Sequence, residues 1–361
     1  MLTIIVTLSI ISLFITILFK FITADGDFTL LSKRSVKREE IEDKVVWITG
    51  ASRGIGEILS KQLASLGAKL IISARNEAEL ERVKKQLVGK YAPQQVMILP
   101  LDLTSGEDVL RKAVQEAESF FDGAGVDYMF HNAAYERPKS SAVDVPEESL
   151  KAAFEVNVLG PICLTRLLVP FMLDRGRGHF VVMSSAAGKS PAPGQAVYSA
   201  TKYALNGYFH TLRSEFCRKG INVTIVCPGP IKTSSAPATS NSSEKESAEK
   251  RVSSERCAEL TIIAASHCLK EVWISYQPVL AVMYLVQYMP SIGFWLMDKI
   301  GARRVEAATQ KGNTYSLGLL FGELVETLVS VSSLGLQNVV ASCYEIRLLL
   351  GIRLIEKDLK I

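Results

Sequence analysis

From residue 41 onward, short apolar runs alternate with amphipathic stretches, and this alternation constrains the fold more than any other feature of the chain. The apolar runs are almost continuously hydrophobic, as strands covered on both faces must be. The runs expected as strands are KVVWITG, KLIISA, QVMILPLD, VDYMFHNAA, HFVVMSS and NVTIVCPG. Helical patterns such as IGEILSKQLASLG and EAELERVKKQL lie between them. Right-handed crossovers place such helices on both faces of one sheet, so the sequence predicts an α/β fold with a doubly wound parallel sheet of the Rossmann type.

The N-terminus has a different character. Residues 1–19 carry no charged side chain and match the roughly 20 apolar residues that a helix needs to cross a bilayer. We therefore expect a single-pass transmembrane anchor over residues 1–22. A cleaved secretion signal is the competing interpretation, although the stretch has no basic leading region and only Ala24 offers a small residue for cleavage. Basic residues follow the apolar stretch, which favours a cytosolic position for the rest of the chain and leaves a lumenal one open.

Composition limits the remaining possibilities. The chain of 361 residues is 48% hydrophobic, which is enough for one large domain. A formal charge of +4 is too small to indicate a nucleic-acid partner. The six cysteines form no C-x-x-C pair, so neither a zinc site nor a disulfide framework is indicated. We expect one domain over 41–300, a mobile Ser-rich loop over 233–250 and a C-terminal extension of unknown role over 301–361.

The first expected strand runs into TGASRGIG and then into a helix. Three glycines let this backbone turn tightly and approach a pyrophosphate, whose charge would lie at the helix N-terminus. The spacing is G-x-x-x-G-x-G rather than G-x-G-x-x-G, and alone it also fits an ordinary strand–helix turn. Its position at the first βα turn favours a dinucleotide site. The turn residues expected to bind the cofactor are Gly50, Ser52, Arg53, Gly54, Ile55 and Gly56.

The end of the second strand indicates which dinucleotide is bound. Near Ala74, where an acid would contact the ribose diol of NAD, the chain has Arg75. Arg75 and Arg53 can hold the 2′-phosphate of NADP between them, so NADP(H) is the expected cofactor. Alternatively, both arginines are solvated surface residues. Glu77, two residues after Arg75, could cap a helix start instead of contacting the ribose. Asp102, at the end of the third expected strand, either accepts from the adenine amino group or caps the next helix.

The stretch AVYSATKYALNG places Tyr198 and Lys202 four positions apart, on one face of a helix. A fixed ammonium group favours the phenolate and moves a phenol whose ordinary pKa is near 10 toward the neutral range. Such pairs occur by chance in many helices. However, an earlier strand ends at Ser184 and Ser185, at the sheet edge where ligands bind. A serine hydroxyl there can hold a substrate carbonyl oxygen while the tyrosine completes the proton transfer.

The motifs TGASRGIG, HNAA, NVLG, SS, YSATK and PGPIKT resemble, in order and spacing, those of the short-chain dehydrogenase/reductase family. The resemblance covers residues 44 to about 235. It implies that Ser185 orients the substrate and that Tyr198 is the general acid/base. It also implies that Lys202 binds the nicotinamide ribose and lowers the tyrosine pKa, and that Asn157 holds a water in the proton relay.

Two further sites follow from the same resemblance. Thr233 looks like the contact to the nicotinamide carboxamide, and Asn132 belongs to the stretch that supports the cofactor pocket. The family usually has NNAG where this chain has HNAA, so His131 and Ala134 depart from the pattern. This difference affects the fine geometry of the pocket rather than the reaction class. We interpret His131 as a buried, hydrogen-bonded structural residue and not as a catalytic one.

Within that family, the anchor and residues 253–290 are similar to the membrane-associated group of dehydrogenase/reductase member 7, which is related to 11-beta-hydroxysteroid dehydrogenase type 1. The similarity implies a lipophilic alcohol or carbonyl substrate, such as a steroid or retinoid, an endoplasmic reticulum membrane and a homodimer as one option. Residues 278–297 are strongly apolar but interrupted by Pro290 and Gly293. They either lie in the bilayer interface or are buried in the core or in a dimer interface.

Two other functions stay open at this stage. A non-catalytic scaffold could bind the cofactor on the same fold, although it would not need Asn157, Ser185, Tyr198 and Lys202 together. A sugar-nucleotide epimerase shares the tyrosine–lysine chemistry but would normally need a G-x-x-G-x-x-G turn. Residues 301–312 are expected to form an exposed basic helix, and Asn222 and Asn241 open N-x-[ST] glycosylation patterns.

Overall fold

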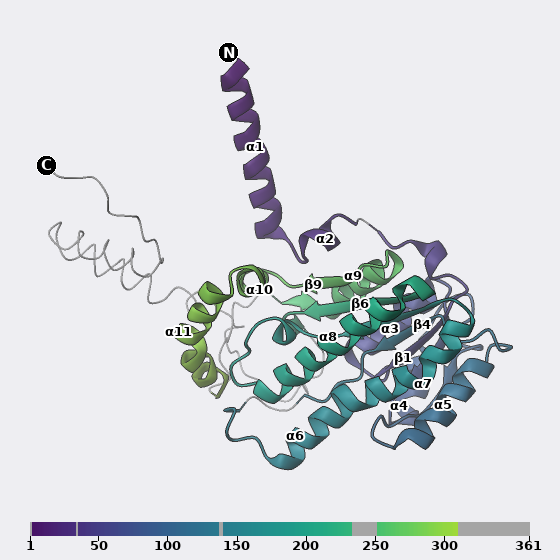
Figure 1. Cartoon of the computed structure of the whole chain (residues 1–361). Helices are drawn as coiled ribbons and strands as arrows, with labels where there is room; N and C mark the ends of the chain where they lie inside the picture. Colours follow the sequence, from purple (N-terminus) through teal and green to yellow (C-terminus); the bar gives the residue numbers. More distant parts are fainter. Residues whose placement is uncertain (1, 34, 137–139, 233–250, 310–361) are drawn as a thin grey trace, which may run out of the picture. The chain divides into compact units, whose positions relative to one another are not determined.

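The computed structural model describes residues 2–33, 35–136, 140–232 and 251–309 (Figure 1). These residues belong to one unit, which extends from Met1 to Thr314. Four of the expectations fall outside the described residues: the mobile loop over 233–250, Thr233, the glycosylation pattern at Asn241 and most of the C-terminal extension.

The centre of the fold is a seven-stranded, fully parallel sheet with the strand order β3-β2-β1-β4-β5-β6-β9 (Figure 1). Its strands are β1 (Val45–Thr49), β2 (Lys69–Ser73), β3 (Met97–Ile98), β4 (Tyr128–His131), β5 (Gly178–Met183), β6 (Ile221–Pro228) and β9 (Glu271–Ile274). The chain reverses its direction of travel across the sheet between β1 and β4. This topological switch point opens a crevice at the carboxyl ends of the strands. The predicted Rossmann-type, doubly wound sheet is confirmed.

Helices cover both faces of the sheet, as the apolar strands require. The helices are α3 (Gly54–Ser65), α4 (Glu77–Lys85), α5 (Glu107–Ser119), α6 (Glu147–Phe154), α7 (Gly160–Asp174), α8 (Ala196–Phe216) and α9 (Ser254–Ser266). Leu59 of α3, Leu80 of α4 and Leu260 of α9 share one core with the strands. Helices α5, α7 and α8 pack on the opposite face. The expected helices IGEILSKQLASLG and EAELERVKKQL correspond to α3 and α4.

The structure adds one strand and corrects two sequence expectations. The edge strand β9 was not among the expected strands. Strand β3 has only two residues, so Asp102 lies beyond the strand, where its carboxylate accepts from the backbone N–H and the hydroxyl of Thr104. The N-cap of α4 is Asn76, whose side chain accepts from Glu79, and not Glu77.

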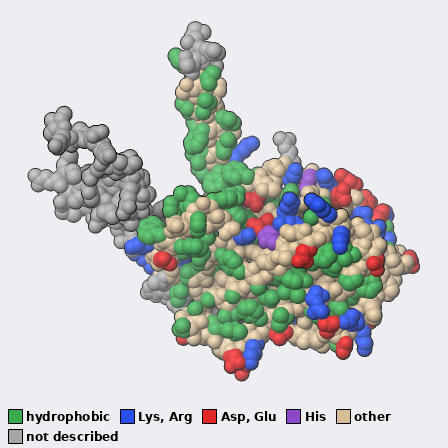
Figure 2. Space-filling model, in the orientation of Figure 1, with side chains coloured by type: hydrophobic (Ala, Val, Ile, Leu, Met, Phe, Trp, Pro, Cys, Tyr) green, Lys and Arg blue, Asp and Glu red, His purple; other side chains and the backbone are tan. Residues whose placement is uncertain are grey.

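Helix α1 (Leu2–Thr23) contains an 18-residue window, Val6–Thr23, with a mean hydropathy of 2.2 and no buried residue. Figure 2 shows hydrophobic side chains along this helix and at its foot. The run Glu147–Asp174 is also long and apolar enough to span a bilayer, but half of it is buried, as in a core helix of a globular domain. Length and composition therefore favour α1 as the membrane segment.

The chain after α1 is built into the domain. Asp27 donates its backbone N–H to the carbonyl oxygen of Trp273 in β9 and accepts from the Trp273 N–H through Oδ2 at 2.7 Å. Its Oδ1 accepts from Leu30 N–H at 2.8 Å, which caps the short helix α2 (Phe28–Leu31). Asp25 pairs with Arg256 of α9 at 2.8 Å. This segment thus covers the free edge of the sheet, where unpaired strand groups would otherwise be exposed.

The last described elements are α10 (Val279–Tyr288) and α11 (Pro290–Thr309). The two helices pack closely, because a Cβ on Gly293 would lie 2.7 Å from the Cα of Val286. Residues 301–309 are helical as expected. However, Arg304 is only 7% exposed, so the expectation of a fully exposed basic helix is wrong at this position.

Candidate active site

The glycine turn between β1 and α3 is shaped for close backbone approach. Gly50 has a φ of +67° and Gly54 a φ of +58°, both in the left-handed region that favours glycine. A Cβ on Gly56 would collide with the carbonyl oxygen of Gly50, whereas a Cβ on Gly54 would have no atom within 4 Å. The turn is therefore closed on the Gly56 side and open at Gly54.

Helix α3 begins directly at Gly54, on the open part of this turn. The N-cap residue of α3, Arg53, makes no side-chain capping bond. The first N–H groups of a helix lack partners within the helix, and together with the dipole they favour an anion. A pyrophosphate fits this arrangement by charge and by backbone geometry. Ser52 and Ile55 lie in the same turn, half-buried, and the Ser52 carbonyl accepts from Arg82 at 2.9 Å.

Asn132, directly after β4, forms hydrogen bonds to the glycine turn. Its Nδ2 donates to the carbonyl oxygens of Thr49 and Gly50, at 3.1 and 3.2 Å. Its backbone N–H donates to the Thr49 hydroxyl at 3.2 Å. A Cβ on Gly50 would lie 2.8 Å from the Cα of Ala133, so the two strand ends are in contact. Asn132 thus ties the end of β4 to the glycine turn.

The two arginines expected at the cofactor ribose are both exposed. Arg53 lies in the glycine turn and Arg75 two residues after β2, so they belong to neighbouring loops at the same sheet edge. Within residues 2–33, 35–136, 140–232 and 251–309, neither arginine has an acidic partner in an ion pair. By contrast, nearby Arg82 is engaged by Glu57 and Glu79. Asp102 is engaged locally with Thr104.

Tyr198 and Lys202 lie on one face of α8, with the Lys202 Nζ 5.4 Å from the centre of the Tyr198 ring. Lys202 is 2% exposed, and its ammonium donates to the Met183 carbonyl at the end of β5, at 2.8 Å. Burial lowers the pKa of Lys202 from 10.5 to about 8. A lysine with that pKa is still mostly charged at neutral pH. A fixed positive charge thus lies beside the phenol.

Ser185 lies two residues after the end of β5 and is the N-cap of the short 3-10 helix η3 (Ala186–Gly188). Its Oγ accepts from the N–H of Ala187 at 3.1 Å, which leaves the hydroxyl proton for another acceptor. Helix η3 packs on α8, since Asn206 Nδ2 donates to the Gly188 carbonyl at 2.9 Å. Ser185 is half-buried, whereas Ser184 is 3% exposed. The serine loop and the Tyr198 helix are thus held together at the sheet edge.

Asn157 lies in the π-helix η2 (Glu155–Leu159), between α6 and α7. Single π turns inside longer helices often mark functional sites. The Asn157 amide accepts from Tyr135 N–H at 2.6 Å and donates to the Tyr135 carbonyl at 2.9 Å and to Thr201 Oγ1 at 3.2 Å. Thr201 in turn donates to the Tyr198 carbonyl at 2.7 Å.

This chain of bonds links the π-helix to the tyrosine helix. Sequence reasoning missed Thr201 and Tyr135, although Thr201 lies three residues after Tyr198 and one turn of helix predicts its proximity. The bonds occupy both amide protons and one lone pair of Asn157, so one lone pair of Oδ1 is left for a water.

His131, at the end of β4, is 3% exposed and its Nε2 lies 2.8 Å from Thr165 Oγ1. Burial lowers the pKa of His131 to about 3, so the ring is neutral. The expectation that His131 is buried and hydrogen-bonded is confirmed, and its structural role stays a prediction.

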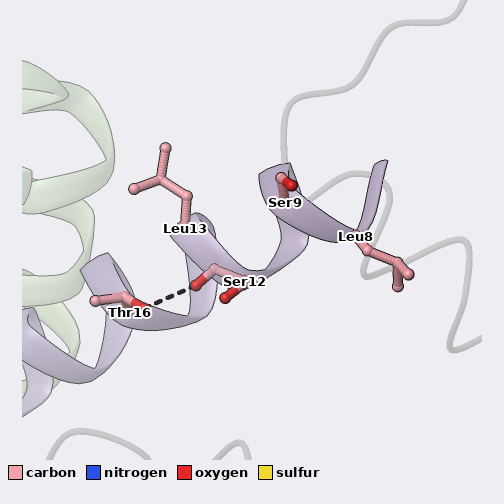
Figure 3. Close-up of a pocket in the computed structure, with 5 residues that line it drawn as sticks. All are labelled: Leu8, Ser9, Ser12, Leu13 and Thr16. Carbon is pink, nitrogen blue, oxygen red and sulfur yellow. Dashed lines mark hydrogen bonds between the residues drawn. The ribbon is translucent and has the colours of Figure 1, made fainter. Parts of the chain in front are cut away.

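A hollow elsewhere in the described residues lies on α1 and is lined by Leu8, Ser9, Ser12, Leu13 and Thr16 (Figure 3). Thr16 Oγ1 donates to the Ser12 carbonyl at 2.8 Å, so this polar group is satisfied within its own helix. The hollow contains no titratable side chain, so it is not a second candidate for the chemistry.

The family model of the short chain dehydrogenases matches residues 44–244, more than half of the chain. The human protein Dehydrogenase/reductase SDR family member 7 is 36% identical over 304 residues, which cover 80% of this chain and 88% of the human protein. The chain belongs to the short-chain dehydrogenase family. A second family member, Dehydrogenase/reductase SDR family protein 7-like of Drosophila melanogaster, is 32% identical over 76% of this chain and 85% of its own length.

Among solved structures of short-chain dehydrogenases, a metagenomic short-chain oxidoreductase in complex with NADP has a TM-score of 0.55 and 24% identity. It covers 66% of this chain and 99% of its own chain, and it supports the fold. As a short-chain dehydrogenase similar to member 7, the protein is an oxidoreductase of the dehydrogenase/reductase kind that uses a nicotinamide cofactor.

Proposed function

We propose that the protein is a membrane-anchored, NADP(H)-dependent oxidoreductase that transfers hydride between the nicotinamide and a lipophilic alcohol or carbonyl compound. The observation that carries this proposal is the buried Lys202 ammonium, 5.4 Å from the centre of the Tyr198 ring. When bound, the cofactor supplies or accepts the hydride. The protein supplies the proton, the orientation of the substrate and the exclusion of water.

Each of the four clustered residues has a distinct part in this proposal. Ser185 donates its free hydroxyl proton to the substrate oxygen and fixes that oxygen near Tyr198. Tyr198 is the general acid for reduction and the general base for oxidation. Lys202 stabilises the phenolate by its charge and contacts the nicotinamide ribose. Asn157 holds the π-helix against α8 and offers its remaining lone pair to a relay water.

The preference for NADP(H) rests on Arg53 and Arg75, which are exposed cations at the ribose end of the site. A guanidinium group binds a phosphate with two parallel hydrogen bonds, and the 2′-phosphate is the group that distinguishes NADP from NAD. Gly50, Gly54 and Gly56 would receive the pyrophosphate, with Asn132 and Asp102 at the pocket walls. Thr233 stays a proposed carboxamide contact.

The lipophilic substrate class is supported by the membrane segment and by similarity to the member 7 group. We take residues 1–22 as the anchor, in the endoplasmic reticulum membrane, and 41–300 as the catalytic domain. Phe21 of α1 stacks on Phe28 at 5.6 Å and contacts Tyr284 of α10 at 5.8 Å. Gln277 also donates to the Phe21 carbonyl at 2.9 Å. The C-terminal end of α1 is therefore held against α10 by these contacts.

Next to this end of α1, α10 and α11 expose the aromatic side chains of Tyr288, Phe294 and Trp295, and Met289 between the two helices is exposed as well. Aromatic side chains of this kind favour the boundary between lipid and water. We propose that this corner lies in the bilayer interface. The fluorescence of Trp295 can test this placement, because Trp295 is 40% exposed while Trp47 and Trp273 are 0% and 6% exposed. Brominated lipid in vesicles that hold the full chain is expected to quench Trp295 fluorescence. Equal quenching of wild type and Trp295→Phe would contradict this placement.

The activity is tested by a steady-state screen of membranes that contain the full chain. NADPH or NADP is offered with steroids, retinoids and simple ketones or alcohols, and NADH or NAD is run beside it. Membranes with equal amounts of Tyr198→Phe are the blank. We expect turnover with lipophilic substrates and NADP(H) only in wild type. Turnover that is equal in the blank would refute the proposal.

The preference for NADP(H) is tested by comparing the KM for NADPH and for NADH in arginine variants. Arg75→Ser and Arg53→Ser are expected to raise the KM for NADPH about tenfold and to leave that for NADH unchanged, because each removes one charged phosphate contact. Arg218→Ser is the matched control, since Arg218 is an exposed arginine after α8, far along the chain from the turn. A KM for NADPH that stays at the wild-type value in both site variants would remove the argument for NADP(H).

A further inference from the structure

A second buried lysine lies four residues after Ser185 and takes no part in the proposed chemistry. Lys189 is 9% exposed, and its Nζ lies 2.7 Å from Oε2 of Glu271. The same carboxylate oxygen accepts from His210 Nε2 at 2.7 Å, and the other oxygen accepts from Trp273 Nε1 at 2.7 Å. Glu271 is thus the centre of a cluster of three donors.

The cluster joins three elements of the fold. Lys189 is the C-cap of η3, whose N-cap is Ser185. His210 lies on α8, two turns beyond Lys202, and Glu271 opens β9. Figure 1 shows β9 beside β6, with α8 and α10 nearby, which agrees with the pairing of β6 with β9. Gln287 of α10 donates to the Lys189 carbonyl at 3.1 Å. The end of the serine loop is therefore held through both its side chain and its backbone.

The electrostatics keep the Glu271 carboxylate charged. Burial raises the pKa of Glu271, but the hydrogen bonds from His210, Lys189 and Trp273 outweigh it and lower that pKa to about 2. Arg213 Nη1 lies 3.1 Å from His210 Nδ1, and because arginine can only donate, this nitrogen accepts. His210 then carries its proton on Nε2 and donates it to Glu271. Every contact in the cluster has a defined direction.

Buried ion pairs of this kind contribute little net stability, because desolvation offsets the attraction between the charges. Their better-supported effect is to select one arrangement of the groups that they join. Here the ion pair joins β9 to the loop of residues 185–189, which is one 3-10 turn long. Lys189 N–H donates to the Ala186 carbonyl, and Ser185 accepts from Ala187 N–H. Since only one turn of backbone separates the two residues, a displacement of Lys189 also moves Ser185.

We propose that Glu271 is a positioning residue. Through Lys189, it fixes the position of the Ser185 hydroxyl relative to Tyr198. This inference rests on the proposed role of Ser185 in orienting the substrate. Glu271 touches no reacting atom. Its effect is on the hydroxyl that holds the substrate oxygen, and small displacements of such groups change rates strongly.

Three variants of the full chain test the inference. Glu271→Gln keeps the shape and removes the charge, Lys189→Met removes the donor, and Lys189→Arg keeps a cation. We expect kcat to fall about tenfold or more in the first two variants and to recover most of the loss in the third. The Kd for NADPH is expected to stay within about twofold of wild type, since the glycine turn lies on other strands.

The matched control is Glu118→Gln. Glu118 of α5 forms a largely buried ion pair with Arg175, the C-cap of α7. The side-chain exposures of Glu118 and Arg175 are 9% and 20%, against 19% and 11% for Glu271 and Lys189. Glu118→Gln is expected to lower stability in the same manner, and the side-chain bonds of Glu118 go to Val126 and Arg175 rather than to the serine loop. An equal fall of kcat in Glu118→Gln, or an unchanged kcat in Glu271→Gln and Lys189→Met, would overturn the inference.

Hydrogen exchange of the full chain gives a readout that does not depend on turnover. In Lys189→Met, the amides of residues 186–190 are expected to exchange faster, while those of 50–56 keep their protection. Unchanged protection of 186–190 would also overturn the inference. If wild type and Tyr198→Phe turn over equally, the proposed function fails. If only Tyr198→Phe is inactive and Glu271→Gln is normal, the positioning inference fails alone.

Discussion

Replacing Lys202 by Met is expected to change how the stability of the protein depends on pH. The pKa of Lys202 falls from 10.5 in the unfolded chain to about 8 in the folded protein, because the ammonium is buried. Between these two values the unfolded chain holds a proton that the folded protein has released, so wild-type stability rises with pH across this window. The shift of about 2.5 pKa units corresponds to about 3 kcal/mol, to order of magnitude. Lys202→Met has no such group and lacks this rise.

The comparison is made with the difference in unfolding free energy between wild type and Lys202→Met. Terms that do not depend on pH, such as the lost hydrogen bond to the Met183 carbonyl, cancel when this difference is followed with pH. Denaturant unfolding of the cofactor-free chain in detergent is measured from pH 7 to pH 10.5. We expect the difference to shift in favour of wild type by about 3 kcal/mol. A difference that is constant with pH, or that shifts toward the variant, would refute the assignment of a buried ammonium beside Tyr198.

Further predictions concern the turn, the tyrosine helix and the covered sheet edge. Gly56→Ala is expected to weaken NADPH binding about tenfold, measured by fluorescence titration, because its Cβ would collide with the Gly50 carbonyl. Gly207→Ala, whose Cβ meets no atom within 4 Å on α8, is expected to raise stability by about 0.5–1 kcal/mol with unchanged activity. Asp27→Ala is expected to cost about 3 kcal/mol in denaturant unfolding, since the backbone N–H groups of Leu30 and Trp273 both lose a charged acceptor. An unfolding midpoint equal to that of wild type would show that Asp27 does not hold the edge.

The sequence alone was sufficient to predict the elements whose residues follow a local hydrophobic or glycine pattern. The strands β1, β2, β4, β5 and β6 are short, continuous apolar runs, and the helix after TGASRGIG follows a glycine turn. Tyr198 and Lys202 were placed together by the period of one helix. These features are local, so neighbouring residues determine them.

What could not be predicted depends on contacts between distant segments. Strand β9 is four residues long, and only its register with β6 makes it a strand. The pairing of Lys189 with Glu271 joins residues 82 positions apart, and no local pattern indicates it. Likewise, the π-helix around Asn157 arises where α6 and α7 meet α8, and Asp27 gains its role only when β9 forms beside it.

The central claim is that Tyr198 exchanges the proton with the substrate. It is tested most directly by measuring kcat and the Kd for NADPH in Tyr198→Phe with the best substrate of the screen. Tyr203→Phe, an exposed tyrosine of the same helix, is the control. We expect kcat to fall by about 10²–10⁴-fold in Tyr198→Phe alone, with the Kd nearly unchanged. Wild-type turnover by Tyr198→Phe would contradict the claim.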